Sequence, residues 1–345
     1  MQKKYLLAAA TAVLTTSLCV MSVVSCSRGT TDIITLDLTE SLNQDVPLSS
    51  SLEKAISSAH CLDLGGVVLA SPRIFHIGDG LCGIRDKGDI YFYDLNSGEQ
   101  LSSFNRKGRG PQEYNSVFGV SFRDGQVCVS DYPSYKKALF YTMEGDFLGV
   151  RELPEEAIFR FFGEKEFVLS YSSNTDKRLT VLRNNEPILE TSCSADVRNT
   201  PIVSYGDVLP GDIYTIQLTD TLYKVSNENV VPYLFFDKGQ YAVPLEERGN
   251  INVVEGCISG EGIVIGGRFG FVDMFYQLPQ REVWDLENEK LLYKVTFSEQ
   301  NQDPGIPLEW NGDSFEFWPV YGTKDALYGF RQLVDKTELV IVNLK

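Results

Sequence analysis

A strand–turn–strand pattern recurs along this chain and constrains its fold more than any other feature. Each copy has an alternating apolar run, a turn rich in Gly, Asn, Asp or Glu, and a shorter apolar run, as in DIYFYDLNSGEQLSSF over residues 89–104. This pattern predicts a β-hairpin. The last large apolar residue before the turn marks each copy: Tyr93, Tyr141, Leu182, Val225, Trp284 and Val342.

The marked residues are 41 to 59 residues apart, which matches the length of a four-stranded propeller blade with loop insertions. A blade cannot bury both of its faces alone, so blades stack on one another and close into a ring. A two-sheet sandwich is the alternative, but sandwiches lack an internal repeat of this length. The sequence therefore predicts an all-β fold, a six-bladed β-propeller of four-stranded antiparallel blades over residues 58–345.

The sixth copy reaches Lys345 directly after one hairpin strand, so the outer strand of its blade is missing. An edge left open there would expose unpaired N–H and C=O groups. The alternating run from Ala59 to Leu64 precedes the first copy and is the candidate for the missing strand. We expect the ring to be closed by this N-terminal strand pairing with the C-terminal blade.

The segment GRGPQEY (residues 108–114) is followed by a strand pair and by the hairpin LFYTMEGDFL (residues 139–148). These stretches resemble the six-bladed β-propeller lipoproteins of Bacteroides-type cell envelopes, whose signature is a GRGPGEY-like turn. Residues 220–225 (DTLYKV) and 233–239 (YLFFDKG) resemble a later blade of that family, and the resemblance covers roughly residues 55–345. Gln112 departs from the family's more frequent Gly. The resemblance implies architecture far more than chemistry, because the family shares no common reaction.

Residues 1–25 have the features of a lipoprotein signal peptide. Lys3 and Lys4 form a positive start, and Tyr5 to Val24 form an apolar run. The small residue Ser25 stands directly before Cys26, as in the bacterial lipobox, so Cys26 is the candidate lipidation site. An uncleaved membrane-spanning anchor is the alternative, since about 20 apolar residues can cross a bilayer. Either arrangement tethers the body to a membrane, outside the cytoplasm.

Residues 26–57 are polar and rich in Ser, Thr and Asp, which predicts a tether between the membrane and the propeller. Within it we expect a short strand over 33–38 and a short helix over 50–58. No acidic run follows Cys26, and this favours a membrane-anchored protein of the cell envelope that faces the periplasm over one at the cell surface.

Composition excludes several classes of function. The chain has 31 Lys and Arg against 47 Asp and Glu, a net charge of −16. Nucleic-acid binding depends on clustered basic residues, so we expect no nucleic-acid partner. Two histidines exclude a three-histidine zinc site, and the sequence has no HExxH, G-x-S-x-G, P-loop or CxxC motif. We therefore expect neither a metal nor a cofactor. Five cysteines remain after Cys19 and Cys26, and their spacing does not set any pairing.

The best functional stretch runs from Arg106 to Tyr114 and crosses from one blade to the next. Arg106, Lys107 and Arg109 form a basic cluster suited to a carboxylate, sulfate or phosphate group, and Glu113 and Tyr114 could complete a polar pocket. The alternative is structural: the glycines and proline of the segment shape an inter-blade turn that an Arg109–Glu113 pair locks. Aromatic residues gather in two expected insertions, 268–280 and 298–318, where they could stack on sugar rings.

Two functions from different classes remain open. The sequence favours a lipid-anchored envelope propeller that acts as a non-catalytic binding or scaffolding module for a glycan, a peptide or an envelope protein. The alternative is a hydrolase or lyase with carboxylates at the propeller pore, because carboxylate pairs are spatial and leave no sequence motif. No catalytic residue can be assigned.

Overall fold

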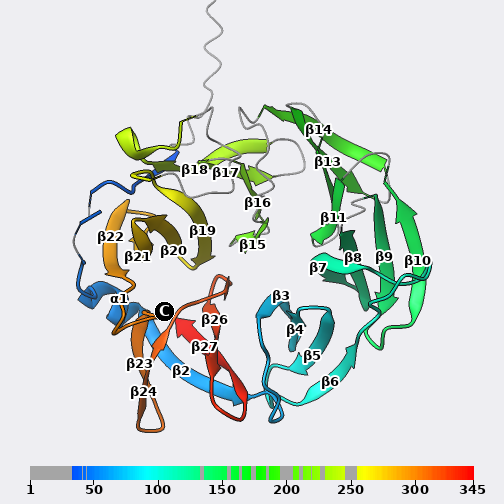
Figure 1. Ribbon diagram of the computed structural model, residues 1–345, viewed down its shortest axis with the longest axis horizontal. Coiled ribbons are helices and arrows are strands. Elements are labelled where there is room, and N and C mark those ends of the chain that lie inside the picture. Colours follow the sequence, from blue (N-terminus) through cyan, green and yellow to red (C-terminus); the bar gives the residue numbers. More distant parts are fainter. Residues whose placement is uncertain are drawn as a thin grey trace, which may run out of the picture. The chain divides into compact units, whose positions relative to one another are not determined.

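The computed structural model describes residues 33–40, 42–43, 45–132, 136–153, 157–162, 165–171, 176–183, 186–194, 205–209, 213–218, 220–225, 230–244 and 255–345. Ile33–Lys345 forms one compact unit that contains all the described elements. Its sheets are arranged around a central axis, with successive sheets following one another around a ring (Figure 1). No helix in the described part of the chain is long and apolar enough to cross a membrane.

Five sheets in the described residues have four antiparallel strands. In the first three, the strands follow the chain order from the inside of the ring outwards. The first sheet contains β3 (Pro72–Gly78), β4 (Leu81–Asp86), β5 (Asp89–Asp94) and β6 (Gln100–Phe104), and the second contains β7 (Ser116–Arg123), β8 (Gln126–Tyr132), β9 (Lys137–Thr142) and β10 (Phe147–Glu152). The third contains β11 (Ala157–Phe162), β12 (Lys165–Tyr171), β13 (Asp176–Arg183) and β14 (Glu186–Ser194).

The other two four-stranded sheets come from the C-terminal part of the chain. Their strands are β19 (Ser259–Gly266), β20 (Phe269–Tyr276), β21 (Leu278–Asp285) and β22 (Lys290–Thr296); β25 (Tyr321–Gly322), β26 (Ala326–Gln332), β27 (Thr337–Leu344) and the N-terminal β2 (Ile56–Asp63). The all-β propeller of four-stranded antiparallel blades is therefore confirmed.

A further sheet has five strands. It consists of the antiparallel strands β15 (Tyr205–Leu209), β16 (Ile213–Leu218), β17 (Thr221–Val225) and β18 (Val230–Asp237), with β1 (Ile34–Asp37) added parallel to β18. The remaining elements are the helix α1 (Ser50–Ala55), the 3₁₀ turn η1 (Gly239–Tyr241), and the hairpin of β23 (Ile306–Trp310) and β24 (Asp313–Phe317).

The hairpin repeat read from the sequence is confirmed as a structural repeat. Its six marked residues lie in β5, β9, β13, β17, β21 and β27, each the third strand of its sheet. The turn between β7 and β8 is a tight two-residue turn. Asp124 and Gly125 have φ values of 49° and 78° there, and positive φ at both central residues is what a two-residue hairpin turn with the twist of its strands requires.

The N-terminal strand closes the last sheet, as the sequence predicts. β2 pairs antiparallel with β27, with Ala59 opposite Val342 and Leu62 opposite Leu339. The Asn343 side chain donates from Nδ2 to the Ser58 hydroxyl at 2.9 Å, which adds a side-chain bond to the strand ladder. The pairing removes the open edge of β27 and joins the two ends of the unit.

From Ile33 onwards, the segment expected to be a polar tether packs on the sheets, which corrects that description for its described part. The predicted short strand and short helix are present as β1 and α1. Leu36, Leu38 and Leu52 are fully buried, and Val46 exchanges two backbone hydrogen bonds with Lys294. These leucines recur among polar residues, and burying each contributes about 1.5–3 kcal/mol, which explains why the segment is not free.

One of the two expected insertions is wrong. Residues 268–280 lie mainly in β20 and β21 of a regular sheet, whose alternating aromatic residues are core and not a loop. The second prediction, 298–318, is confirmed as an insertion because it holds the extra hairpin β23–β24 between β22 and β25.

Adjacent sheets are joined by apolar clusters. One cluster contains Phe92 of the first sheet and Val120, Val127 and Tyr141 of the second. The next contains Cys128 and Ala138 of the second sheet with Phe159 and Phe161 of the third, and Val168 beside them. The second sheet therefore buries both of its faces against its neighbours, as radial stacking requires.

Candidate functional site

The segment from Arg106 to Tyr114 joins β6 to β7 and so makes the predicted crossing between the first two sheets. Tyr114 is fully buried, and its hydroxyl donates to the Gly88 carbonyl oxygen at 2.7 Å and accepts from the Arg106 backbone N–H at 2.9 Å. Burial raises the pKa of Tyr114 to about 12. Tyr114 is thus a structural residue that fastens the crossing to the first sheet.

Glu113 shapes the same turn. Its carboxylate accepts from the Gly110 backbone N–H at 2.7 Å and lies where a side chain on Gly108 would have to be. No ion pair between Glu113 and Arg109 is present among the described residues, so the predicted lock is made by a backbone hydrogen bond instead. The glycines at 108 and 110 are needed because the glutamate folds back over them.

The three basic residues of the crossing are exposed. Arg106 donates from Nε to the Gly145 carbonyl oxygen at 2.8 Å, which ties the crossing to the second sheet. The Lys107 backbone N–H donates to the Asn105 side chain at 2.8 Å. The structure therefore brings Arg106, Glu113 and Tyr114 together as parts of a turn, and the side chains of Lys107 and Arg109 are exposed beside it.

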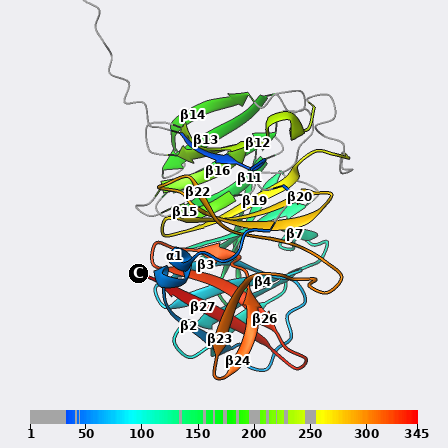
Figure 2. The same cartoon turned by 90° about the vertical axis from the view of Figure 1, so that its left-hand side faces the viewer.

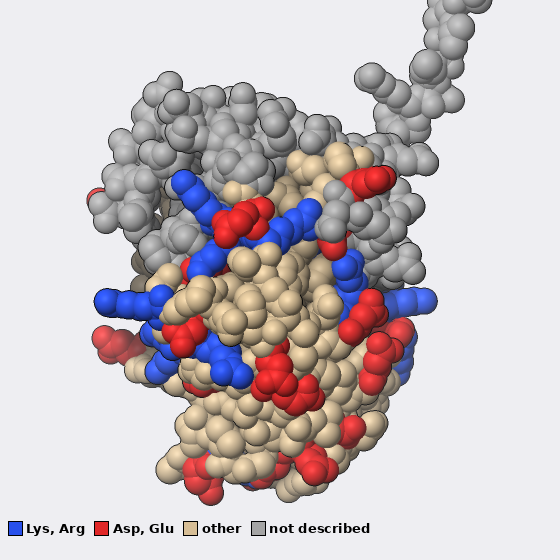
Figure 3. Space-filling model, turned by 90° about the vertical axis from the view of Figure 1, so that its right-hand side faces the viewer, with Lys and Arg blue, Asp and Glu red and all other residues tan. Residues whose placement is uncertain are grey.

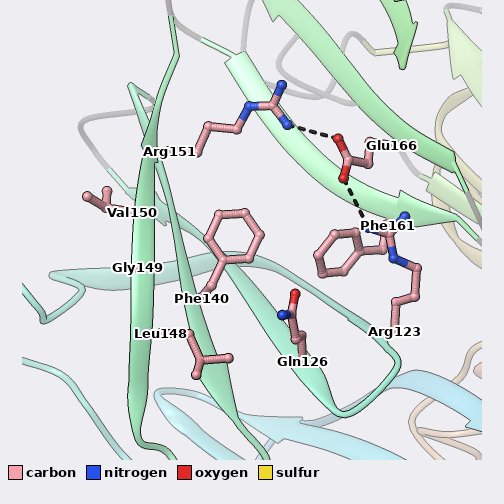
Figure 4. Close-up of a pocket in the computed structure, with 9 residues that line it drawn as sticks. All are labelled: Arg123, Gln126, Phe140, Leu148, Gly149, Val150, Arg151, Phe161 and Glu166. Atoms are coloured by element: carbon pink, nitrogen blue, oxygen red, sulfur yellow. Dashed lines mark hydrogen bonds and ion pairs between the residues drawn. The ribbon is translucent and has the colours of Figure 1, made fainter. Parts of the chain in front are cut away.

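A pocket of about 410 Å³ lies between the second and third sheets (Figure 4). It is built by the ends of β7 and β11, the starts of β8 and β12, and the outer strands β9 and β10. Its lining residues are Arg123, Gln126, Phe140, Leu148, Gly149, Val150, Arg151, Phe161 and Glu166.

One carboxylate at this pocket is held by two guanidinium groups. Glu166 lies 3.0 Å from Arg123 through Oε1 and 2.9 Å from Arg151 through Oε2 (Figure 4). The Glu166 side chain is 9% exposed, whereas those of the two arginines are 23% and 27% exposed. Charge-assisted bonds of this kind are roughly twice as strong as neutral ones, so they fix both arginines in place.

Aromatic rings support both arginines. The Arg123 guanidinium lies 4.1 Å from the centre of the Phe161 ring, and that of Arg151 lies 4.9 Å from the centre of the Phe159 ring. Both distances are within the range of a cation–π interaction. Phe140 packs against both rings, at 5.7 Å from Phe161 and 5.6 Å from Phe159. The pocket therefore combines a rigid aromatic wall with two positioned cations.

The outermost strand of the second sheet forms the other wall. β10 is last in the strand order, so one of its edges is not paired within the sheet. Leu148 and Val150 are 50% and 46% exposed, and no atom lies within 4 Å of where a side chain on Gly149 would begin. On the side of the molecule where β10 is outermost, charged side chains of both signs surround a patch of other residues (Figure 3). Strand edges of this kind accept extended peptides.

The pocket suits binding better than carboxylate catalysis. Both oxygens of Glu166 are occupied by guanidinium groups, and Glu166 is the single acidic residue among the described lining residues. A glycosidase needs two carboxylates about 5–10 Å apart. Among the described lining residues two arginines accompany one glutamate, a combination that a carboxylate or another anion would complement.

Sequence reasoning missed this pocket. Arg123 stands directly before the Asp-Gly turn of its hairpin, and Arg151 and Glu166 belong to no recognised motif. They come from β7, β10 and β12 and meet only because the second and third sheets stack side by side. The sequence feature that comes nearest to indicating the pocket is the run Leu148-Gly149-Val150-Arg151, in which an edge strand has apolar residues on its outer face.

The remaining candidates can be placed briefly. Cys19 and Cys26 lie outside the described residues, as does the side chain of Cys193. The remaining four cysteines, Cys61, Cys82, Cys128 and Cys257, are free, and Cys82 and Cys128 are buried. No group of His, Cys, Asp or Glu among the described residues could hold a metal ion.

No protein-family model matches the sequence, and no curated protein matches it. Among solved structures, a Bacteroides fragilis protein described as exported superposes with a TM-score of 0.63 at 15% identity, over 91% of this chain and 99% of that chain. The β-propeller domain of Cps50 (Swd1) from Myceliophteria thermophila has a TM-score of 0.44 at 9% identity, over 76% and 79%. BamB from Moraxella catarrhalis has 0.36 at 13% identity, over 83% and 71%. The first of these shows a shared propeller fold.

Proposed function

We propose that this chain is a non-catalytic binding propeller of the cell envelope that holds an extended segment of a protein partner in the pocket between its second and third sheets. The observation that carries the proposal is the pair Arg123 and Arg151, each fixed by Glu166 and each lying against an aromatic ring. A preorganised cation pair of this kind recognises a carboxylate at little entropic cost.

The unpaired edge of β10 favours an extended peptide over a small anion as the ligand of the pocket. A peptide added to this edge would form main-chain hydrogen bonds, place apolar side chains on Leu148 and Val150, and bring a carboxylate to the arginines. The apolar walls and the charged end together define the ligand class: an extended peptide with alternating apolar residues and an acidic side chain or a free carboxyl end.

We further propose that the five-stranded sheet is the sixth blade of the ring. Four of its strands, β15 to β18, have the same antiparallel order as the other sheets, and the marked residue Val225 lies in its third strand. β1 then adds a parallel strand to the outside of that blade.

The anchor and the location follow from the leader. We propose that residues 1–25 are a signal peptide, that Cys26 is lipidated, and that the protein faces the periplasm. The exposed Lys107 and Arg109, beside Arg106, Glu113 and Tyr114, stay candidates for a second contact with an anionic group of a glycan or a protein partner.

The test of the binding site uses short acetylated peptides with alternating apolar residues, which end either in a free carboxylate or in a carboxamide. We expect the carboxylate peptides to bind more tightly. Arg123→Ala and Arg151→Ala should each weaken this binding about 10- to 100-fold, because charged hydrogen bonds contribute about 1.5–3 kcal/mol. Arg109→Ala tests the crossing segment as the alternative site; Arg109 does not line the pocket, so this change should leave the affinity for these short peptides unchanged.

Two results would count against the site. The first is equal affinity for the carboxylate and carboxamide peptides. The second is a loss in Arg109→Ala as large as in Arg151→Ala, which would move the site to the crossing segment. Thermal melting of each variant separates lost affinity from lost folding.

The anchor has a separate test. Cells that express the chain are fed an alkyne-labelled fatty acid, and the purified protein is examined for the label. The label should be present in the natural chain and in Cys19→Ser, and absent from Cys26→Ser. Label retained in Cys26→Ser would contradict lipidation at that residue.

A further inference from the structure

A second hollow, of about 830 Å³, lies where three sheets meet α1. It is lined by α1, by β1 and β18 of the five-stranded sheet, by the β19–β20, β21–β22 and β25–β26 turns, and by the end of β27. Figure 2 shows α1 and the C-terminal end side by side, in agreement with the hydrogen bond from the Lys345 N–H to the Ala55 carbonyl oxygen at 2.9 Å.

The rim of this hollow is held by backbone hydrogen bonds between different elements. The Gly267 N–H donates to the Thr323 carbonyl oxygen at 2.9 Å, which joins the β19–β20 turn to the β25–β26 turn. The Leu286 N–H donates to the Arg268 carbonyl oxygen at 2.9 Å. The surface is therefore a fixed feature of the fold and not a single mobile loop.

The rim is basic on an acidic protein. Its exposed cations are Lys54, Arg268, Lys324 and Lys345, and its acidic residues are Glu287 and Asp325. We call these four cations the basic rim. Arg268 is paired with Asp285 at 3.4 Å and Glu287 at 3.6 Å, whereas the three lysines have no ion-pair partner among the described residues. The excess of cations reverses the balance of the whole chain, which has 31 basic and 47 acidic residues.

The floor of the hollow is apolar. Phe269 and Leu286 are buried in it, and Ile34, Tyr233 and Leu344 are half-buried around it. Cations placed around an apolar floor are the composition of a surface that rests on lipid headgroups, where lysine stems cover apolar area and their ammonium groups reach phosphates.

The covalent chain restricts which surface can reach a membrane. Ile34 lines the hollow, and the chain from Cys26 to Ile34 spans at most roughly 30 Å when fully extended. A unit of this length has a radius of gyration of roughly 20 Å, so the far side of the unit cannot approach a membrane that holds Cys26. The hollow can.

We propose that the basic rim docks on the anionic phospholipid surface of the membrane in which the chain is anchored. The orientation rests on the proposed lipid anchor. The charge of the rim and its position beside Ile34 select a phospholipid surface over free phosphate, because a single phosphate would leave the apolar floor and most of the lysines uncovered. Basic residues near an anionic membrane contribute about 1 kcal/mol each, or about fivefold in the docked population.

The test replaces the natural anchor, so that it does not depend on Cys26. Residues 33–345 contain every described strand, the closing β2–β27 pair and the apolar clusters, and so form a complete folding unit. This unit receives an N-terminal histidine tag and is held on vesicles that carry nickel-chelating lipid. The vesicles contain either phosphatidylglycerol or phosphatidylcholine. A water-soluble acetylating reagent then reports the exposure of each lysine by mass spectrometry.

On phosphatidylglycerol vesicles we expect acetylation of Lys54, Lys324 and Lys345 to fall at least fivefold, and to recover in 1 M salt, where the screening length is about 3 Å. Lys87 and Lys107, which are exposed and do not line the hollow, should react equally on both vesicles. The variant Lys54→Glu/Lys324→Glu should lose the protection of Lys345.

Equal acetylation of the rim lysines on both kinds of vesicle would overturn the proposal. Protection of Lys87 and Lys107 to the same degree would overturn it as well, because it would place another face on the membrane. Protection of the rim lysines by free inorganic phosphate in place of vesicles would assign the site to a soluble anion. A failed fatty-acid label at Cys26 would remove the natural anchor but would not change these readings.

Discussion

The buried hydroxyl of Tyr114 donates a hydrogen bond of 2.7 Å to the backbone carbonyl oxygen of Gly88, across the gap between the β6–β7 crossing and the first sheet. The same hydroxyl accepts from the Arg106 N–H at 2.9 Å. One side-chain atom therefore satisfies two backbone groups from two segments, and this bond explains why a tyrosine ends the crossing.

Tyr114→Phe should lower the free energy of unfolding by about 1–3 kcal/mol, because it leaves both backbone groups without their partner. Urea denaturation measures the change. Tyr93→Phe is the matched control: the Tyr93 hydroxyl is buried with no hydrogen-bond partner among the described residues, so its loss should be neutral or stabilising. Equal destabilisation by the two changes would contradict this account of Tyr114.

The turn before Tyr114 gives a second prediction. Gly108→Ala places a methyl group where the Glu113 carboxylate lies, so the carboxylate must leave the Gly110 N–H, at a cost of about 1–3 kcal/mol. Arg109→Ala removes an exposed side chain and should change stability by less than about 0.5 kcal/mol. A large loss of stability in Arg109→Ala would restore the Arg109–Glu113 lock expected from the sequence.

Lys238 gives a third prediction, about the contact between two sheets. Its buried ammonium lies 2.7 Å from Asp220, which immediately precedes β17, and 2.7 Å from Glu261 in β19. Lys238→Met should lower the free energy of unfolding by about 3–5 kcal/mol, because two poorly exposed carboxylates lose their common cation. Lys336→Met is the control. Lys336 also bridges two carboxylates, Asp63 and Glu338, but its side chain is 29% exposed against 5% for Lys238, and Arg331 still pairs with Glu338, so little change is expected. Calorimetry measures both changes. Equal losses of unfolding free energy in Lys238→Met and Lys336→Met would show that the burial of the lysine does not determine the size of the loss.

Acid should weaken the fold through His76. Burial holds the pKa of His76 below its usual value, although Asp79 and the Gly78 backbone act in the opposite direction. Since the unfolded chain takes up a proton at a higher pH than the folded one, this contribution to stability is complete above about pH 6.5 and is lost as the pH falls below it.

The measurement is the urea midpoint between pH 7.5 and pH 5. The midpoints give the free energy of unfolding at each pH. The part of its slope against pH that depends on His76 cannot exceed about 1.4 kcal/mol per pH unit, and this part should disappear in His76→Gln. His60→Gln serves as the comparison, as His60 is the other histidine of the chain. An unchanged slope in His76→Gln would assign the acid sensitivity to other groups.

The sequence predicts the fold well where its pattern is local. Alternation and turn residues mark hairpins, so the third strand of each four- or five-stranded sheet could be located, and the run from Ala59 to Leu64 could be matched to a missing partner. The parallel pairing of β1 with β18 could not be predicted, because a short run such as Ile34–Asp37 has the same pattern whether it pairs or stays free. The expectation of an insertion over 268–280 is wrong because Phe269 and Phe271 alternate along β20 as core residues of a regular strand.

The candidate site is harder to predict than the fold. The segment from Arg106 to Tyr114 stands out in the sequence because its residue types are unusual. In the structure, however, the side chains of Glu113 and Tyr114 form hydrogen bonds with backbone groups. Arg123, Arg151 and Glu166 have nothing unusual nearby in sequence. Their meeting depends on how two sheets stack, and no local pattern specifies that angle. The residues that shape a turn are therefore visible in sequence, while those that meet across sheets are not.

The strand that completes the last sheet has a consequence for how the molecule folds. The bond from the Ser57 hydroxyl to the Asn343 carbonyl oxygen joins residues 286 positions apart, so β2 has no partner until almost the whole chain has been made. Contacts between such distant positions carry a large loop-closure cost and slow folding. The β2–β27 pair therefore cannot form until the C-terminal strand is available, and until then the edge of β2 that will receive β27 stays unpaired.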